Sequence, residues 1–364
     1  MKILHITPSY FPATKFGGPI FSMKIINQHL SKKNYIEVIT TQAGTNNEKN
    51  KHLIDKIKVN YLPFYFNENF TFSPKLIIYL IKNIYKYDLI QINSIWNFHF
   101  IISALLCRIY KKPYVIYPKG SLDKNAINNR KKIIKNIYLI LIRKLIDRAN
   151  AIIYSSNFEK RNISKIICPK NGLVIANPIE VKRDVGQFKK EKIILYLGRI
   201  ANNKGIAELI NRFTHTKLGY QLIIAGEIED QKYYQKIRKL FKKDKRIKFL
   251  KNQNQKNKNK LICRSFCTIL PSIVNENFGN SIAESMVLKT PVIVSSKAGI
   301  SEYVKKYNCG VIINPEKYSL IQAVEIIENN YTRYQNNGKK LVAEKFEAKI
   351  VAQKINKLYA KIIK

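Results

Sequence analysis

Hydrophobic and polar positions follow two patterns along the chain, short continuous apolar runs and longer stretches with apolar residues every three or four positions. The runs are typical of buried strands, and the periodic stretches are typical of amphipathic helices. Strands are predicted at residues 2–6, 36–40, 58–62, 89–92, 114–117, 151–154, 172–175, 192–197, 221–225, 247–250, 268–270 and 292–294. Helices are predicted between them, including 19–31, 74–86, 130–148, 159–167 and 231–243, and at the end at 319–328, 331–344 and 348–363. This alternation predicts mostly parallel, doubly wound sheets.

The alternation is interrupted once, over residues 180–191, where no periodicity is present. This stretch is therefore predicted to link two Rossmann-like α/β domains, and 364 residues are enough for two cores of ordinary size. We place the first domain at 1–178, the second at 179–345, and a last helix at 346–364. The polar run 251–260 is predicted to be a solvated loop.

The composition argues against a membrane-spanning protein, a secreted protein and a zinc protein. No apolar run approaches the ~20 residues that cross a membrane, and the first residues are too short for a signal peptide. The five cysteines are odd in number and lack the spacing of a zinc site, so a reduced, cytoplasmic protein without a metal is expected.

The formal charge of +41 suggests a polyanionic partner, either nucleic acid or an anionic membrane surface. Only 12 of the 65 basic residues are arginine, however, and base reading depends on arginine forks. A general lysine excess therefore argues against a specific nucleic-acid partner. The basic helix 130–148 sets Ile137, Leu141 and Leu145 against lysines and arginines. It either lies on an anionic bilayer or is an ordinary helix facing the core.

The stretch from Leu270 to Val294 carries the clearest candidate chemistry. A strand ends at Leu270, a loop contains Glu276, and a helix follows with Glu284 one turn inside it. The carboxyl edge of a parallel sheet is where ligands bind, and free N–H groups at the helix start suit an anion or a polyhydroxyl ligand. Two carboxylates there suit a sugar nucleotide, one for hexose hydroxyls and one for the ribose diol. Alternatively, Ser281 and Glu284 form a capping box that only closes the helix.

A second candidate cluster follows the strand 192–197. Arg199 and Lys204 lie between that strand and the next helix, and arginine is scarce in this chain. Fixed cations at a strand end can stabilise a departing diphosphate without a metal ion. The alternative is an ordinary surface pair.

The run from Glu276 to Glu284, with Pro291 and with Gly299-Ile-Ser-Glu302 after it, resembles the E-x7-E region of family 4 of the retaining glycosyltransferases. The resemblance implies a GT-B fold, in which two domains face each other across a cleft and the last helix returns to the N-terminal domain. It also implies transfer with retention, with Arg199, Lys204 and Glu276 in the catalytic roles. The donor site that it implies consists of Gly17, Gly18, Arg199, Lys204, Glu276, Asn277, Phe278, Gly279 and Glu284.

Two residues are candidates on the acceptor side. His99 follows the strand 89–92 and is either a proton relay or a packing histidine beside two phenylalanines. Lys119 occupies the region in which many family members carry a histidine, and Pro118-Lys-Gly with Trp96 is similar to a polysaccharide-assembly branch of the family. Lys119 either binds an acceptor phosphate or lies idle on the surface.

We therefore expect a metal-independent hexosyltransferase that needs no cofactor and uses a UDP- or GDP-sugar donor. The expected acceptor is a glycan or polyprenyl-linked molecule in capsule, O-antigen or exopolysaccharide synthesis. The expected location is cytoplasmic, peripheral on the inner face of the membrane. The alternatives are a GT-B sugar-nucleotide epimerase or phosphorylase, and a basic nucleic-acid-binding α/β protein.

Overall fold

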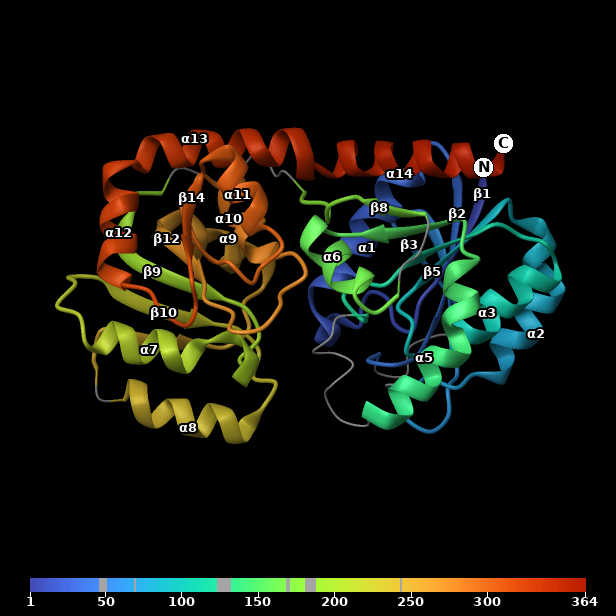
Figure 1. The fold of residues 1–364 in the computed structure, drawn as a ribbon, viewed down its shortest axis with the longest axis horizontal. Coiled ribbons are helices and arrows are strands. Elements are labelled where there is room, and N and C mark those ends of the chain that lie inside the picture. Colours follow the sequence, from blue (N-terminus) through green and yellow to red (C-terminus); the bar gives the residue numbers. More distant parts are fainter. Residues whose placement is uncertain (46–50, 69, 123–131, 168–170, 181–187, 243) are drawn as a thin grey trace. The chain divides into compact units, whose positions relative to one another are not determined.

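A computed structural model describes residues 1–364 except 46–50, 69, 123–131, 168–170, 181–187 and 243, and it leaves the side chains of 51–52 and 132–136 undescribed. Most of the predicted linker lies outside the described residues. The chain divides into two compact units (Figure 1). Unit 1 comprises Met1–Glu180 with Ala348–Lys364, and unit 2 comprises Val181–Glu347. Each unit is described by itself below.

Unit 1 contains an 8-stranded sheet in the order β3-β4-β2-β1-β5-β6-β7-β8. Its strands are β1 (Lys2–Ile6), β2 (Tyr35–Thr41), β3 (Lys51–Ile54), β4 (Ile57–Leu62), β5 (Leu89–Asn93), β6 (Tyr114–Tyr117), β7 (Ala151–Tyr154) and β8 (Gly172–Val174). All neighbours pair in parallel except β3 with β4. Strand β3 was not predicted. Its turn uses Asp55 and Lys56, both at positive φ, where a sequence signal would need glycine or asparagine.

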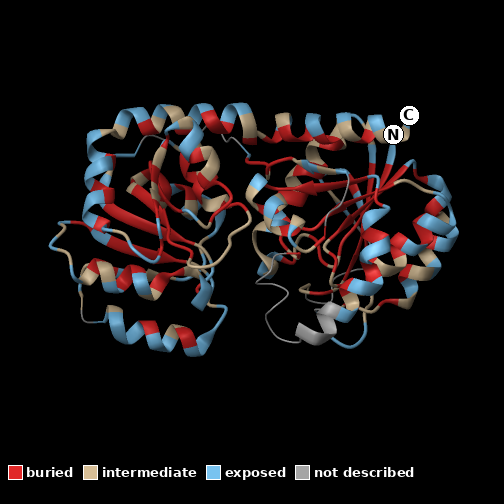
Figure 2. Cartoon of the chain, in the orientation of Figure 1, coloured by how far each residue is buried: buried red, intermediate tan, exposed pale blue. Residues whose placement is uncertain are grey.

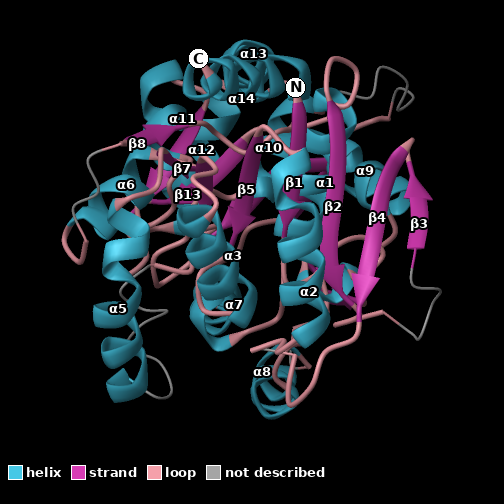
Figure 3. Cartoon of the chain, turned by 90° about the vertical axis from the view of Figure 1, so that its right-hand side faces the viewer, coloured by secondary structure: helices cyan, strands magenta, loops and turns pink. Residues whose placement is uncertain are grey.

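Successive residues of the unit 1 strands face opposite helix layers, as the two-residue period of a strand requires. One face packs against α2 (Pro74–Asn83), α3 (Phe98–Ile109), α5 (Lys132–Asp147) and α6 (Asn157–Ser164). Figure 3 shows α2, α3 and α5 along that face. The other face packs against α1 (Gly18–Leu30) and α14 (Ala348–Ile363). Because both faces are covered, the strands read as continuous apolar runs (Figure 2).

Helix α14 ends the chain yet belongs to unit 1. Val351, Ile355 and Tyr359 are fully buried there, and the helix contacts α1. The expected return of the last helix to the N-terminal domain is confirmed.

Unit 2 contains a 6-stranded parallel sheet in the order β11-β10-β9-β12-β13-β14. Its strands are β9 (Glu191–Leu197), β10 (Gln221–Ala225), β11 (Ile247–Leu250), β12 (Ser265–Leu270), β13 (Val292–Ser295) and β14 (Gly310–Ile313). Its helices are α7 (Ile206–Thr214), α8 (Gln231–Phe241), α9 (Gln255–Arg264), α10 (Asn280–Val287), α11 (Ser301–Tyr307), α12 (Leu320–Asn329) and α13 (Tyr331–Leu341). The predicted fold class, two parallel α/β domains, is confirmed.

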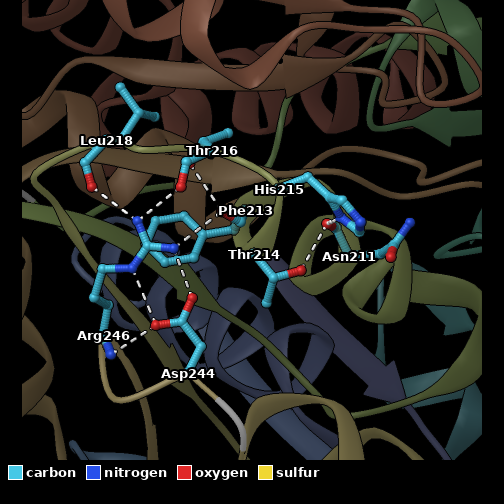
Figure 4. Close-up of polar contacts among 8 residues, drawn as sticks. All are labelled: Asn211, Phe213, Thr214, His215, Thr216, Leu218, Asp244 and Arg246. Atoms are coloured by element: carbon cyan, nitrogen blue, oxygen red, sulfur yellow. Dashed lines mark hydrogen bonds and ion pairs between the residues drawn. The ribbon is translucent and has the colours of Figure 1, made fainter.

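Two features of unit 2 were not visible in the sequence. The polar run 251–260 is not a loop throughout, because α9 begins inside it, with the Asn254 side chain accepting the N–H of Asn257 at 2.9 Å. Arg246 ties the start of β11 to the turn before β10. Its guanidinium donates to the carbonyls of Thr216 and Leu218 at 2.9 and 3.0 Å and pairs with Asp244 at 2.6 Å (Figure 4). This scarce arginine is therefore structural.

Candidate functional site

The exits of β9 and β12, which are neighbours in the unit 2 sheet, bring Lys204 and Glu276 together as an ion pair. Their side chains are 13% and 26% exposed, so the pair is largely withdrawn from water. Gly205 makes this approach sterically feasible. It sits at φ +70°, and a Cβ there would lie 2.1 Å from the carbonyl oxygen of Pro271 at the exit of β12. The two loops are thus in backbone contact, and Lys204 is fixed by the glycine that follows it.

Arg199 lies at the exit of β9 and pairs with Glu229, Nη1 to Oε2, at 2.5 Å. The N–H of Ile200 donates to the backbone carbonyl of Glu227, and the N–H of Glu229 donates to the backbone carbonyl of Ile200. The loop after β10 therefore lies against the loop after β9. Both side chains of the pair are about half exposed, at 49% and 48%. Glu229 has no signal in the sequence, because its contact with Arg199 depends on the β9–β10 pairing.

The loop that contains Glu276 is held by the loop after β13. Glu276 forms a bridge with Ala298, and the N–H of Ile300 donates to the carbonyl of Phe278 at 2.9 Å. The Phe278 ring is buried edge-on against Phe346, with ring centres 5.1 Å apart. Gly279 sits at φ +114° and is the N-cap of α10. Asn277, Phe278 and Gly279 therefore form the turn that leads directly into the first residues of α10.

Glu284 lies in α10, and its Oε1 accepts a hydrogen bond from Lys258 Nζ of α9 at 2.8 Å. The capping-box alternative is wrong. The helix begins at Asn280 with Gly279 as its N-cap, and no side chain caps it, so Ser281 is already inside the helix. Lys258, from the run predicted to be solvated, is instead the partner of a candidate donor-binding carboxylate.

Gly17 and Gly18 lie in unit 1 at the start of α1. Gly17 is its N-cap at φ +73°, and a Cβ placed there would meet nothing within 4 Å. The sharp turn uses the conformational freedom of glycine, and the space beside it leaves the backbone open to a ligand. Their relation to the donor residues of unit 2 stays a prediction.

Lys119 follows β6 in unit 1, and the expectation that it lies idle on the surface is wrong. Its ammonium is buried and has no hydrogen-bond partner among the described residues. It lies 4.1 Å from the centre of the Tyr117 ring. Burial lowers the pKa of Lys119 to about 7, although the nearby Glu159 acts in the opposite direction. Such a pKa places the amine near half protonation at neutral pH.

His99 lies in the first turn of α3 and is 1% exposed. Its Nε2 lies 2.8 Å from the carbonyl oxygen of Asn93, and burial lowers the pKa of the ring to about 4. A neutral, enclosed imidazole of this kind favours the packing alternative over a proton relay.

The described part of the chain contains no group of three or more His, Cys, Asp or Glu side chains that could hold a metal ion. None of its helices has the length and apolar character needed to cross a membrane.

Two protein-family models match this chain, and both describe glycosyltransferases. Residues 179–341 match the model for glycosyl transferases group 1, and residues 23–183 match the model for glycosyltransferase family 4. The chain belongs to these glycosyltransferases. The family resemblance drawn from the region around Glu276 and Glu284 is thus confirmed, and so is the expectation of an enzyme.

Two curated glycosyltransferases illustrate the relationship. The uncharacterized glycosyltransferase MJ1607 of Methanocaldococcus jannaschii is 27% identical over 296 residues, which is 75% of this chain and 75% of that protein. The capsular polysaccharide biosynthesis glycosyltransferase CapM of Staphylococcus aureus is 22% identical over 292 residues, 72% of this chain and 74% of its own.

Solved structures show the same fold. HepE of Anabaena, solved in complex with UDP-glucose, superimposes with a TM-score of 0.77 at 17% identity over 99% of this glycosyltransferase and 100% of HepE. Sucrose-phosphate synthase of Thermosynechococcus elongatus gives 0.76 at 17% identity over 99% and 98% of the two chains. The GT-B fold implied by the resemblance is therefore confirmed.

Proposed function

We propose that this glycosyltransferase moves a hexose from a UDP- or GDP-sugar to a glycan or polyprenyl-linked acceptor, with retention of configuration and without a metal ion. The observation that carries the proposal is the partly buried pair of Lys204 and Glu276, with Arg199 at the exit of the same strand β9. A cation and a carboxylate side by side suit a sugar diphosphate, whose phosphates need positive charge and whose sugar hydroxyls need an acceptor. HepE, whose structure contains UDP-glucose, supports a nucleotide-sugar donor.

In the proposed site, Arg199 and Lys204 hold the diphosphate and stabilise the charge that grows on it as the glycosidic bond breaks. The exposed pair of Arg199 with Glu229 contributes little in water, whereas a phosphate can accept two parallel hydrogen bonds from a guanidinium. The donor therefore displaces Glu229 from Arg199. An ammonium has three N–H donors, so Lys204 keeps Glu276 while it binds a phosphate oxygen.

The carboxylates take the hydroxyl groups of the donor. Glu276 accepts from the hexose, and the N–H groups around Asn277, Phe278 and Gly279 complete that contact at the start of α10. Glu284 accepts from the ribose diol with the oxygen that Lys258 leaves free. Gly17 and Gly18 of unit 1 are the remaining donor-binding residues of the proposal.

In unit 1, we assign Lys119 to the binding of the acceptor. A buried amine with no hydrogen-bond partner among the described residues is suited to an acceptor phosphate. The likeness to CapM supports a role in cell-surface polysaccharide synthesis, such as capsule, O-antigen or exopolysaccharide. We place the enzyme in the cytoplasm, at the inner face of the membrane where a polyprenyl-linked acceptor is found.

The proposal is tested by donor binding and turnover. Thermal denaturation with a panel of UDP- and GDP-sugars identifies the donor by the largest rise in Tm. Release of nucleoside diphosphate from that donor is then measured in EDTA, and the anomeric configuration of the product is read by NMR. We expect turnover to persist in EDTA, and we expect the product to have the same anomeric configuration as the donor sugar.

Arg199→Ala and Glu276→Gln should each lower kcat/KM roughly 100-fold or more, because they remove charge stabilisation at the transition state. Arg238→Ala is the matched control, since Arg238 is an exposed arginine of α8 in the same unit. Wild-type turnover in Arg199→Ala and Glu276→Gln would remove the proposed site.

A further inference from the structure

The exposed face of helix α5 in unit 1 carries large apolar side chains. Ile137, Ile140 and Leu141 are 55%, 74% and 71% exposed, and they form what we call the apolar stripe. The opposite side of the helix packs into the core through Leu139, Ile142, Leu145 and Ile146. The prediction that Ile137 and Leu141 share a face with Leu145 is wrong, because Leu145 is buried and the other two are exposed. The helix is apolar on two sides, of which the core covers one.

The apolar stripe continues into basic side chains. Lys144 is exposed and lies seven residues beyond Ile137, so it extends the same helix face, and the exposed Arg148 directly follows the last residue of the helix. The one acidic side chain on the described exposed part of the helix, Asp147, pairs with Arg143 at 3.9 Å. Lys144 and Arg148 therefore add to the positive charge beside the stripe.

Helices α3 and α5 contact each other (Figures 1 and 3). A basic hollow lies at their C-terminal ends. It encloses about 710 Å³, and its lining includes Arg108, Lys111 and Arg148 together with the exposed apolar residues Leu105 and Ile109. None of its lining residues is acidic. We call the apolar stripe and this basic hollow together the α3–α5 surface.

We propose that the α3–α5 surface binds an anionic lipid bilayer, with Ile137, Ile140 and Leu141 inserted among the acyl chains and the basic hollow holding a lipid phosphate. A helix with a basic polar side and large aliphatic residues lies in the plane of a bilayer interface in this way. The occupant must accept both aliphatic side chains and positive charge, and an anionic bilayer offers the matching acyl chains and phosphates.

Other partners fit less well. A second copy of the chain presents the same positive surface, so a symmetric contact brings like charges together. Single-stranded nucleic acid prefers aromatic side chains on which its bases stack, and the apolar stripe consists of isoleucine and leucine. Both partners are outcomes that the test separates.

This inference deepens the peripheral location in the proposed function, although the binding itself does not depend on glycosyl transfer. The surface and the donor-site residues share no side chain. Membrane binding and donor turnover are therefore measured separately on the same proteins.

The test is co-flotation of the full-length protein with vesicles of phosphatidylcholine, with and without phosphatidylglycerol. Binding is expected only with the anionic lipid, and it should weaken at high salt. The double variant Ile140→Ser, Leu141→Ser should lower the vesicle partition coefficient roughly 20-fold. The loss is smaller than for two fully buried side chains, because each side chain keeps part of its area in water when the protein is bound. Lys144→Ser with Arg148→Ser should lower it by about fivefold per charge.

Lys339→Ser with Lys340→Ser, on exposed positions of α13, is the charge-matched control, and Ile321→Ser on α12 is the apolar control. Both controls should float as the wild type does, and donor turnover should be unchanged in every variant. Equal binding to neutral vesicles, or α3–α5 variants that bind normally, would overturn the proposal.

Two further results would also overturn it. One is a shift of oligomeric state in the Ile140→Ser, Leu141→Ser variant, which would assign the surface to a second copy. The other is displacement of the vesicles by a single-stranded RNA, which would assign it to nucleic acid. If the wild type binds vesicles but turns over no sugar nucleotide, the surface stands and the proposed function falls.

Discussion

Replacement of Gly205 by alanine should loosen the contact that fixes Lys204. The added methyl group would lie 2.1 Å from the Pro271 carbonyl oxygen, whereas real contacts of this kind essentially never fall below 3.0 Å. The loops after β9 and β12 must therefore separate by about 1 Å, at a cost of roughly 1–3 kcal/mol. The backbone at φ +70° adds about 1–2 kcal/mol for a residue with a Cβ.

The expected loss of stability is thus roughly 2–5 kcal/mol, which corresponds to a fall of about 4–20 °C in the Tm of a unit of this size. Because a displacement of about 1 Å at a reacting group can lower a rate up to 100-fold, kcat/KM should fall by about tenfold to 100-fold. Differential scanning calorimetry measures the first quantity. Release of nucleoside diphosphate, assayed well below the transition, measures the second.

Gly219→Ala is the matched control, because Gly219 has no positive φ and nothing lies within 4 Å of its Cβ position. It should leave both quantities unchanged. A Gly205→Ala protein with the wild-type Tm would refute the loop contact itself. A protein that melts early but keeps its turnover would show that the contact supports unit 2 without positioning Lys204.

Three other changes have defined outcomes. Lys258→Met should raise the donor KM about tenfold with kcat nearly unchanged, since Glu284 loses its orienting partner. Lys258→Arg should restore much of the affinity. Equal effects on KM and kcat would contradict this role of Lys258. Glu229→Gln should lower the donor KM about twofold to fivefold, because Arg199 is no longer paired before the donor arrives, and a raised KM would show that Glu229 assists binding. Wild-type stability should rise between pH 7 and 10.5, because the folded-state pKa of Lys119 is about 7 against an ordinary 10.5 and the unfolded chain binds more protons over that range. Burial also lowers the pKa of Lys190, to about 8, so Lys119→Met should flatten the rise between pH 7 and 8 and only reduce it above pH 8. Urea unfolding experiments measure this slope, and a slope unchanged from the wild type would assign the rise to other groups.

The sequence predicted most of the fold for a physical reason. Strands buried on both faces must be continuously apolar, and helices on a sheet must be apolar on one side, so both leave a local pattern. Where the signal was not local, the prediction was wrong or incomplete. Strand β3 depends on pairing with β4, and the start of α9 depends on the Asn254 cap within a run of lysines and asparagines.

The candidate site shows the same division. Its main residues Arg199, Lys204, Glu276 and Glu284 were named from the sequence because each stands at a fixed distance from a strand end or helix start. Only the tertiary structure supplied their partners. Glu229 reaches Arg199 through the β9–β10 pairing, and Lys258 reaches Glu284 from another helix, 26 residues away in the chain.

Exposure, too, was decided only in three dimensions. The sequence determined that α5 is a helix rich in apolar and basic residues, but periodicity cannot say which of two apolar faces a sheet will cover. Packing against the sheet and α3 buries Ile142 and Leu145 and leaves Ile140 and Leu141 in solvent. The sequence thus determines which residue types occur in each helix, strand and loop. The packing of strands and helices decides which residues contact one another and which remain exposed.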